Sequence, residues 1–172
     1  MAAFAALDGL VSKEDCLRVA GTFPGVPHRM EFIREIRGVR FYNDSIASSP
    51  SRTIAGLRAW PKPPVILLGG HDKHIPFNEL GDELCLHAKA AVLCGETAER
   101  IEAAIRGSKY FRKHQLPIVV EDDFKSAIMK AYDLAEEGDL VALSPACSSF
   151  DKFKNFAERG NTFRAIVEAL EE

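Results

Sequence analysis

The stretch LVALSPACSSFDKFKNFAERG, residues 140–160, decides the fold. It opens with four apolar residues, Leu140–Leu143, and passes through Ser144-Pro145 and a run of small residues into an amphipathic segment. A short apolar run without alternation is typical of a strand that is buried on both faces, as in a parallel sheet. The stretch therefore predicts a buried strand, then a loop, then a helix. The helix would carry a stripe of three phenylalanines, which we expect to be core rather than ligand contacts: Phe150, Phe153 and Phe156.

The same order of strand and helix recurs toward the N-terminus. Short apolar runs bounded by glycine, proline or charge are Pro64–Leu68, Ala90–Leu93 and Pro117–Val120, with amphipathic helices between them. Phe32–Ile36 and Val39–Asn43 flank Arg37-Gly38, a candidate two-residue hairpin turn. Alternating strands and helices predict an α/β fold with a mainly parallel sheet, helices on both faces and one antiparallel hairpin at the start.

Residues 1–24 do not share this pattern. Ala2–Val11 is typical of the end of an Ala-rich helix, and a second short helix is predicted from Lys13, capped by Ser12, to Gly21. A loop with two prolines follows. We therefore expect residues 1–24 to be the helical tail of a preceding domain plus a linker, and 25–172 to be the α/β domain.

The composition is that of an ordinary globular protein. The 172 residues are 47% apolar and 27% charged, with a formal net charge of −3, which gives no electrostatic case for a nucleic-acid partner. No signal peptide or membrane segment is predicted, so we expect a cytoplasmic protein without a membrane partner. The four cysteines form no C-x-x-C pair and are expected to be free thiols.

Ligands of such sheets bind outside the carboxyl ends of the strands, and three strand ends are unusual. The first lies in FYNDSIASSPSRT, residues 41–53, where Asn43-Asp44 is followed by small hydroxyl residues. Ser49 as cap and Pro50 at the first helical position would begin a helix whose N-terminus favours anions. Ordinary helix capping is the alternative interpretation.

The second strand end is VILLGGHDKH, residues 65–74. Gly69-Gly70 allows a sharp backbone turn and presents Lys73, which could hold a carboxylate or a phosphate. His71 and His74 could instead suggest a metal site, but two histidines without further ligands are a weak signal. We expect no metal site in this chain.

The third strand end is the serine-rich loop of residues 144–149. Its serines lie in no G-x-S-x-G motif, so they are better hydrogen-bond donors to a bound carboxylate than nucleophiles. The acidic run Glu121-Asp122-Asp123 also follows a strand, and we interpret Asp122 as a helix cap rather than a phosphoacceptor. Neither G-x-x-x-x-G-K-[ST] nor G-x-G-x-x-G occurs, so another domain must supply most of any ATP site.

Four stretches together resemble the Mur ligase family, and within it the D-glutamate-adding branch. They are PHRMEFI (27–33), NDSIASSP (43–50), GGHDK (69–73) and LSPACSSFDKFKNFAERGNTF (143–163). The resemblance runs from about Gly21 to the end of the chain. It implies a Rossmann-like C-terminal domain that binds the incoming amino acid in peptidoglycan synthesis. The P-loop and metal ligands would lie in a central ATPase domain, so the chain alone is expected to be inactive.

The resemblance also implies the reaction and the site residues. ATP, with Mg²⁺, would phosphorylate the carboxylate of UDP-N-acetylmuramoyl-L-alanine, and the amine of D-glutamate would attack the acyl phosphate. No side chain of this chain would act as a nucleophile. Residues implied at the D-glutamate side-chain carboxylate are Lys73, Ser149, Phe156 through its backbone, and Ser48. Residues implied near ATP are Arg29, Asp44 and Asn43, while His28 belongs to the motif without an assigned role.

The first motif departs from the family pattern, which usually reads Asp-Ser-Lys-Ala-Thr. Ile46 replaces the lysine and Ser48 replaces the threonine. Serine keeps the hydroxyl group, but isoleucine loses a positive charge. Arg52, six residues later, is long enough to supply that charge from the first turn of the predicted helix, or it could simply point to solvent.

Two other interpretations stay open at this point. Another Mur ligase or a folate polyglutamating enzyme would share the architecture, although LSPACSSFD argues against both. A free-standing receiver-like module would need acidic residues after the first strand and a lysine after the last. Here the acidic run comes late, and the last strand ends in Leu-Ser-Pro.

Overall fold

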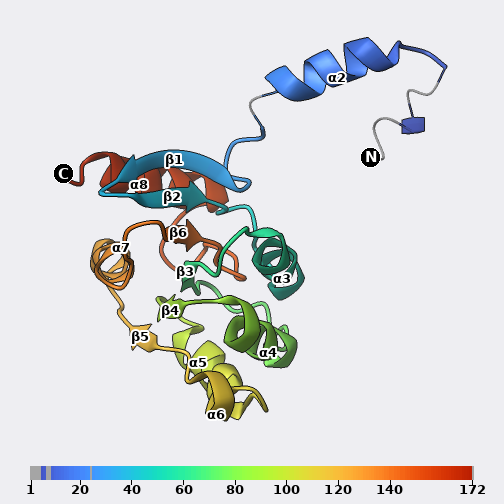
Figure 1. Ribbon diagram of the computed structural model, residues 1–172. Coiled ribbons are helices and arrows are strands. Elements are labelled where there is room, and N and C mark those ends of the chain that lie inside the picture. The colour runs from blue at the N-terminus through green and yellow to red at the C-terminus, as the bar shows by residue number, and fades with distance from the viewer. Residues whose placement is uncertain (1–4, 7–8, 24, 172) are drawn as a thin grey trace.

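The computed structural model describes residues 5, 6, 9–23 and 25–171. Six strands form one sheet in the order β1-β2-β6-β3-β4-β5 (Figure 1). Their bounds are β1 Glu31–Ile36, β2 Val39–Asn43, β3 Val65–Leu68, β4 Ala90–Leu93, β5 Ile118–Val120 and β6 Leu140–Leu143. Every neighbouring pair is parallel except β1 and β2. This confirms the predicted α/β fold and its single antiparallel hairpin.

The hairpin turn lies where the sequence places it. Arg37 and Gly38 both adopt positive φ angles, 48° and 75°, and Ile36 pairs with Val39 across the turn. Two-residue loops with positive φ match the twist of the strands that they join. The turn therefore fixes the register that ends β2 at Asn43, immediately before the polar loop of the site.

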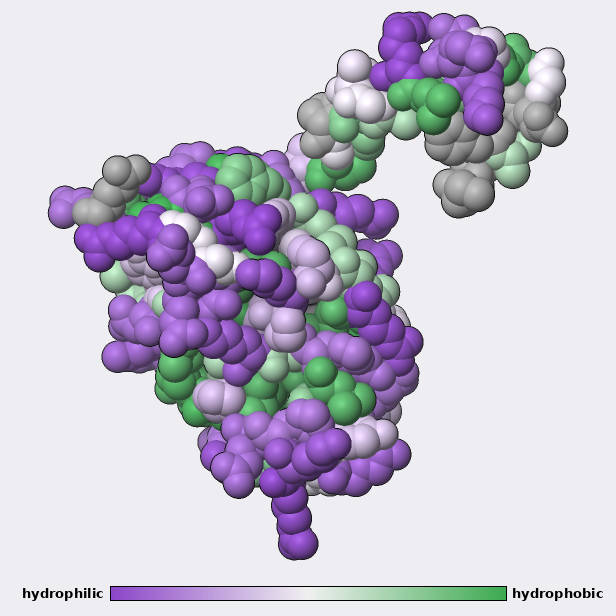
Figure 2. Space-filling model, viewed as in Figure 1, coloured by the Kyte–Doolittle hydropathy of each residue, from purple (hydrophilic) through white to green (hydrophobic). Residues whose placement is uncertain are grey.

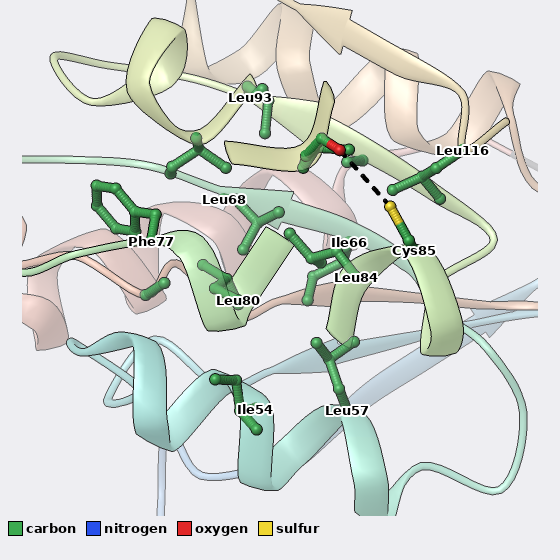
Figure 3. Close-up of a cluster of buried hydrophobic side chains, with 14 of the residues drawn as sticks. Ile54, Leu57, Ile66, Leu68, Phe77, Leu80, Leu84, Cys85, Leu93 and Leu116 are labelled. Carbon is green, nitrogen blue, oxygen red and sulfur yellow. Dashed lines mark hydrogen bonds between the residues drawn. The ribbon is translucent and has the colours of Figure 1, made fainter. Parts of the chain in front are cut away.

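Helices cover both faces of the sheet, as predicted. One face carries α3 (Pro50–Ala59), α4 (Asn78–His87), α5 (Ala98–Gly107) and α6 (Phe111–His114). Figure 3 shows its core, in which leucines and isoleucines of these helices pack on β3 and β4. The other face carries α7 (Phe124–Asp133) and α8 (Phe156–Glu168). Each fully buried aliphatic side chain contributes about 1.5–3 kcal/mol, so the two cores hold the strand ends rigidly.

Three predictions about local structure between residues 120 and 160 were wrong. Helix α8 begins only at Phe156, where Asn155 Oδ1 accepts from Glu158 N at 2.8 Å, so the phenylalanine stripe does not lie on one helix. The stripe is not core either, because Phe150 is 67% exposed and Phe156 is 38% exposed. The cap of α7 is Asp123, whose Oδ2 accepts from Ser126 N at 2.8 Å, and not Asp122.

The N-terminal residues form an arm beside the α/β body (Figure 1). Helix α2 spans Lys13–Thr22, one residue beyond the predicted end, and Ser12 Oγ accepts from Asp15 N at 3.1 Å as its cap. None of its residues is buried, and apolar side chains are exposed on the arm (Figure 2). Of the helix predicted over 2–11, residues 2–4 and 7–8 lie outside the described residues. Gly9–Val11 form a turn and a bend, so that helix does not reach Val11.

Membrane insertion through a helix finds no support in the part of the chain that the structure describes. No helix there is both long enough and apolar enough to cross a bilayer.

Candidate functional site

The three unusual strand ends meet at one edge of the sheet, because β2, β6 and β3 are adjacent and parallel. The loop after β6 bonds to both neighbours: Ala146 N donates to Ala47 O (3.0 Å), and His71 N donates to Ser148 O (2.9 Å). Lys73 Nζ joins the other two loops by donating to Ser48 O at 3.1 Å. The three loops that the sequence singled out therefore lie together.

Gly70 brings the backbone of its loop close to the serine-rich loop. Its φ is 142°, and a Cβ atom at this position would collide with the carbonyl oxygen of Ser148. Only glycine accepts both the positive φ and the close contact. The tight Gly69-Gly70 turn thus allows the loop that carries Lys73 to lie directly against the serine-rich loop.

The residues implied for D-glutamate lie around this junction. Lys73 is exposed and bonded to the Ser48 carbonyl, while Ser149 is buried and its carbonyl accepts from Lys152 N and Phe153 N. In the described part of the chain, no residue accepts a hydrogen bond from Ser149 Oγ. Phe156 is linked to the loop after β2 through its backbone, because its carbonyl accepts from Ser45 Oγ at 2.8 Å. A lysine cation and a serine hydroxyl at one loop junction are suited to hold a carboxylate.

A separate pocket of about 260 Å³ lies beside the loop after β2. Its lining includes Arg29, Asp44, Ile46, Arg52 and Gly56. The Asp44 carboxylate is buried, accepts from Met30 N at 3.2 Å and from Ser144 Oγ at 2.8 Å, and faces two cationic side chains of the lining. Burial raises the pKa of Asp44, and the hydrogen bonds from Ser144 and Met30 oppose that rise. The structure therefore places Arg29 and Asp44 together.

Asn43 does not line this pocket. Its side chain is buried against α8, where Nδ2 donates to Gly160 O (3.3 Å) and to Glu31 Oε2 (3.2 Å) and lies 2.9 Å from His28 Nδ1. Glu31 Oε2 also accepts from His28 N at 3.0 Å. The network supports residues 28–30, in which His28 and Met30 adopt positive φ angles of 63° and 44°. Asn43 and His28 thus fix the loop that presents Arg29.

Arg159 is a site residue that the sequence interpretation missed. Its side chain is 2% exposed, and Nε donates to Ser45 Oγ at 3.0 Å. Nη2 donates to Ser45 O (3.0 Å) and Cys147 O (3.1 Å), and Nη1 donates to Ser148 O (3.2 Å). Burial lowers the pKa of Arg159 to about 10, which leaves the guanidinium charged at neutral pH. No carboxylate of the described residues forms an ion pair with it.

Arg159 therefore joins the loops after β2 and β6 and places an unpaired positive charge behind them. Only its position in the quoted stretch, three residues after Phe156, could have drawn attention to it.

The geometry gives little support to the alternative chemistries, which are a metal site at His71 and His74 and a serine or cysteine nucleophile. His71 Nδ1 lies 2.8 Å from Glu96 Oε2, and His74 Nδ1 lies 3.3 Å from Asp72 Oδ2, so each histidine pairs with a carboxylate of its own. Ser144 Oγ bonds to Asp44 and Thr53, and no histidine of the described residues hydrogen-bonds to it as a base. Cys147 is a buried free thiol whose pKa is raised to about 11 by burial, which makes it a poor nucleophile.

Comparisons with known proteins agree with the resemblance. Residues 28–147 match the sequence profile described as "Mur ligase, glutamate ligase domain". The chain is 52% identical over 170 residues to the UDP-N-acetylmuramoylalanine--D-glutamate ligase of Clostridium novyi, covering 99% of this chain and 37% of that protein. It is 48% identical over 167 residues to the ligase of the same name from Clostridium perfringens, with 97% and 36% coverage. The chain thus spans little more than a third of these curated relatives.

Two solved structures share the fold. A murein peptide ligase from Psychrobacter arcticus aligns with a TM-score of 0.56 at 17% identity, over 98% of this chain and 35% of that one. The folylpolyglutamate synthase of Mycobacterium tuberculosis, complexed with ADP and AMPPCP, aligns with a TM-score of 0.59 at 13% identity, over 93% and 37%. These two structures show only that the fold is shared, because their sequence identities are low. The match to the family profile covers residues 28–147 and therefore decides the family. The chain belongs to the Mur ligase family, and its α/β body is that family's glutamate ligase domain.

Proposed function

We propose that this chain is the amino-acid-binding domain of a longer, ATP-dependent ligase that adds D-glutamate to UDP-N-acetylmuramoyl-L-alanine. The observation that carries the proposal is the bond from Lys73 to Ser48 O, together with the backbone bonds that join the loop of Ser149 to the loops of these two residues. It is supported by close identity to proteins that bear the name of this ligase. We place residues 1–24 in the preceding domain and its linker, because α2 buries no residue against the body.

The proposed reaction needs no nucleophile from this chain. Transfer of the terminal phosphoryl group of ATP to the UDP-sugar carboxylate gives an acyl phosphate and ADP. The D-glutamate amine then attacks the acyl carbon, the new amide loses a proton, and phosphate leaves. Lys73 and Ser149 would hold the side-chain carboxylate of D-glutamate and so fix the direction of its amine. Holding two reactants in position lowers the barrier without covalent catalysis.

The pocket at Arg29, Asp44 and Arg52 suits one end of ATP. Two cationic side chains can contact phosphate oxygens, and the Asp44 carboxylate can accept from hydroxyl or amino groups. Among the described residues, no group of three His, Cys, Asp or Glu side chains is arranged to hold a metal ion. We therefore assign Mg²⁺, which would neutralise the phosphate charge, mainly to residues outside this chain.

Substrate selectivity of the complete protein tests the proposed function. Phosphate release, measured with ATP, Mg²⁺ and UDP-N-acetylmuramoyl-L-alanine present, should require D-glutamate. L-glutamate and D-glutamine should support less than about a hundredth of that rate, because each misplaces or lacks the carboxylate that Lys73 would bind. Equal rates with D-glutamine would refute the assignment of a carboxylate site.

Arg52 offers a second test, which concerns the missing family lysine. Its guanidinium folds back over the start of α3, and Nη1 donates to Ile46 O at 3.2 Å. We infer that Arg52 supplies the charge that isoleucine lacks. Arg52→Ala should lower kcat/KM by about ten-fold in the complete protein, as expected for a lost charge-assisted contact. Adding Ile46→Lys should restore part of the loss. Wild-type kinetics for Arg52→Ala would show that this pocket does without the charge.

A further inference from the structure

The loop that carries Lys73 is held from the side by the start of α5. Arg100, in the first turn of α5, forms an ion pair with Asp72 Oδ2 and donates from Nη2 to Ile75 O at 3.5 Å. Its guanidinium also stacks 5.1 Å from the ring centroid of Phe77. One arginine thus contacts residues on both sides of Lys73 in the sequence.

Asp72 completes the restraint from within the loop. Its Oδ1 accepts from His74 N at 2.7 Å, which stabilises the positive φ of 57° at His74. Glu96 Oε2 accepts from Asp72 N at 3.4 Å. The Asp72 side chain is only 13% exposed, so its negative charge has little access to solvent. Lys73 therefore lies between two residues whose backbones are both anchored.

The charge of Asp72 poses a problem for an anion site. Hydrogen bonding from His74 N, together with Arg100, lowers the pKa of Asp72, so the carboxylate is ionised at neutral pH. A negative charge beside Lys73 would repel a ligand carboxylate. Two side chains pair with the Asp72 carboxylate: Arg100, which is the permanent cation, and His74, whose Nδ1 lies 3.3 Å from Oδ2 but whose side chain is 91% exposed.

We propose that Arg100 and Asp72 are positioning residues of the amino-acid site, and that Arg100 also neutralises Asp72 so that Lys73 can attract a carboxylate. The inference rests on the proposed function of Lys73. It makes two separable statements: the pair orders the loop of residues 71–76, and the charge of Arg100 is needed for affinity toward D-glutamate.

The kinetic test uses the complete protein with ATP and D-glutamate varied in turn. Arg100→Met should raise the KM for D-glutamate about five- to ten-fold, and should change kcat and the KM for ATP less than about two-fold. The double variant Asp72→Asn/Arg100→Met should recover most of the affinity, because it removes the uncompensated charge. Arg100→Lys keeps the positive charge but loses the planar fork, so its KM for D-glutamate should lie between those of wild type and Arg100→Met.

The matched control is Arg106→Met, on the same helix. Arg106 pairs with Glu102 at 2.7 Å on the far turn of α5 and contacts no residue of the loop. It should behave as wild type. Equal D-glutamate KM values for Arg100→Met and Arg106→Met, or a double variant no better than Arg100→Met, would overturn the electrostatic statement.

Hydrogen exchange of the same proteins provides a readout that does not depend on catalysis. The amides of Asp72 and His74 should exchange faster in Arg100→Met than in Arg106→Met, since their loop would lose its anchor. Unchanged exchange would overturn the ordering statement even if the enzyme is active. Failure of the wild-type protein to use D-glutamate would instead reject the proposed function, and faster exchange would still support the ordering statement.

Discussion

Lys73→Ala in the complete protein is expected to raise the KM for D-glutamate far more than the KM for ATP. Lys73 bridges two strand-end loops through its bond to Ser48 O, and its ammonium group is the exposed cation at their junction. A charge-assisted hydrogen bond contributes about 1.5–3 kcal/mol, which corresponds to about a ten- to a hundred-fold loss. The backbone bond to Ser48 contributes less, because its acceptor is neutral.

Steady-state kinetics with each substrate varied in turn measures this effect. Lys73→Arg should recover part of the loss, because the charge remains while the shape changes. Lys109→Ala is the matched control, since Lys109 stacks on Tyr110 at 5.0 Å beyond the end of α5. D-glutamate kinetics in Lys73→Ala equal to those of the control would show that Lys73 is an ordinary surface residue.

Arg159→Met should lower kcat/KM for D-glutamate on the order of a hundred-fold, because small displacements of positioning groups have effects of that size. The guanidinium joins Ser45 in one loop to Cys147 and Ser148 in another. Its removal frees two loops that must bind the same substrate. The free energy of unfolding should change less than this loss of activity suggests, because two contributions of opposite sign partly cancel. The carbonyl groups of Ser45 and Cys147 would lose this donor, at a cost of about 1–3 kcal/mol each, whereas Ser148 O would keep its bond from His71 N. Loss of a buried, desolvated cation returns several kcal/mol.

Arg159→Lys separates charge from geometry. A lysine keeps the positive charge but cannot donate to both loops with a planar fork. If the hydrogen bonds that join the two loops matter most, Arg159→Lys should resemble Arg159→Met. If the positive charge matters most, Arg159→Lys should approach wild type. Chemical denaturation measures the free energy of unfolding in parallel. A fall in kcat/KM that is fully matched by unfolding of the protein would contradict a role in the site.

The sheet could be predicted from the sequence because local signals and tertiary packing agree there. Short apolar runs such as Leu140–Leu143 can be buried only between helices. The observed bounds of the strands match the predicted ones or differ from them by one residue. The same pattern directed attention to the three loops of the site, because ligands of parallel sheets bind at the carboxyl ends of the strands.

The features that the sequence did not predict correctly have a different origin. The spacing of Phe150, Phe153 and Phe156 suggested a helix face, but α8 begins only at Phe156, so that Phe150 lies in a turn and Phe153 in a bend. Arg159 could not be distinguished from a surface arginine, because its burial depends on carbonyl groups of two distant loops. Asn43 and Asp44 are neighbours in sequence, yet their side chains contact different parts of the fold. Such long-range polar contacts leave no local pattern.

The assignment of ATP chemistry to another domain is tested most directly by phosphate release from the 172-residue chain, compared with that from the complete protein. Both would receive ATP, Mg²⁺, UDP-N-acetylmuramoyl-L-alanine and D-glutamate. The complete protein should release phosphate only when D-glutamate is present, and the chain alone should give the rate of the blank, because it contains no P-loop. Turnover by the purified chain alone would contradict the assignment of ATP chemistry to another domain.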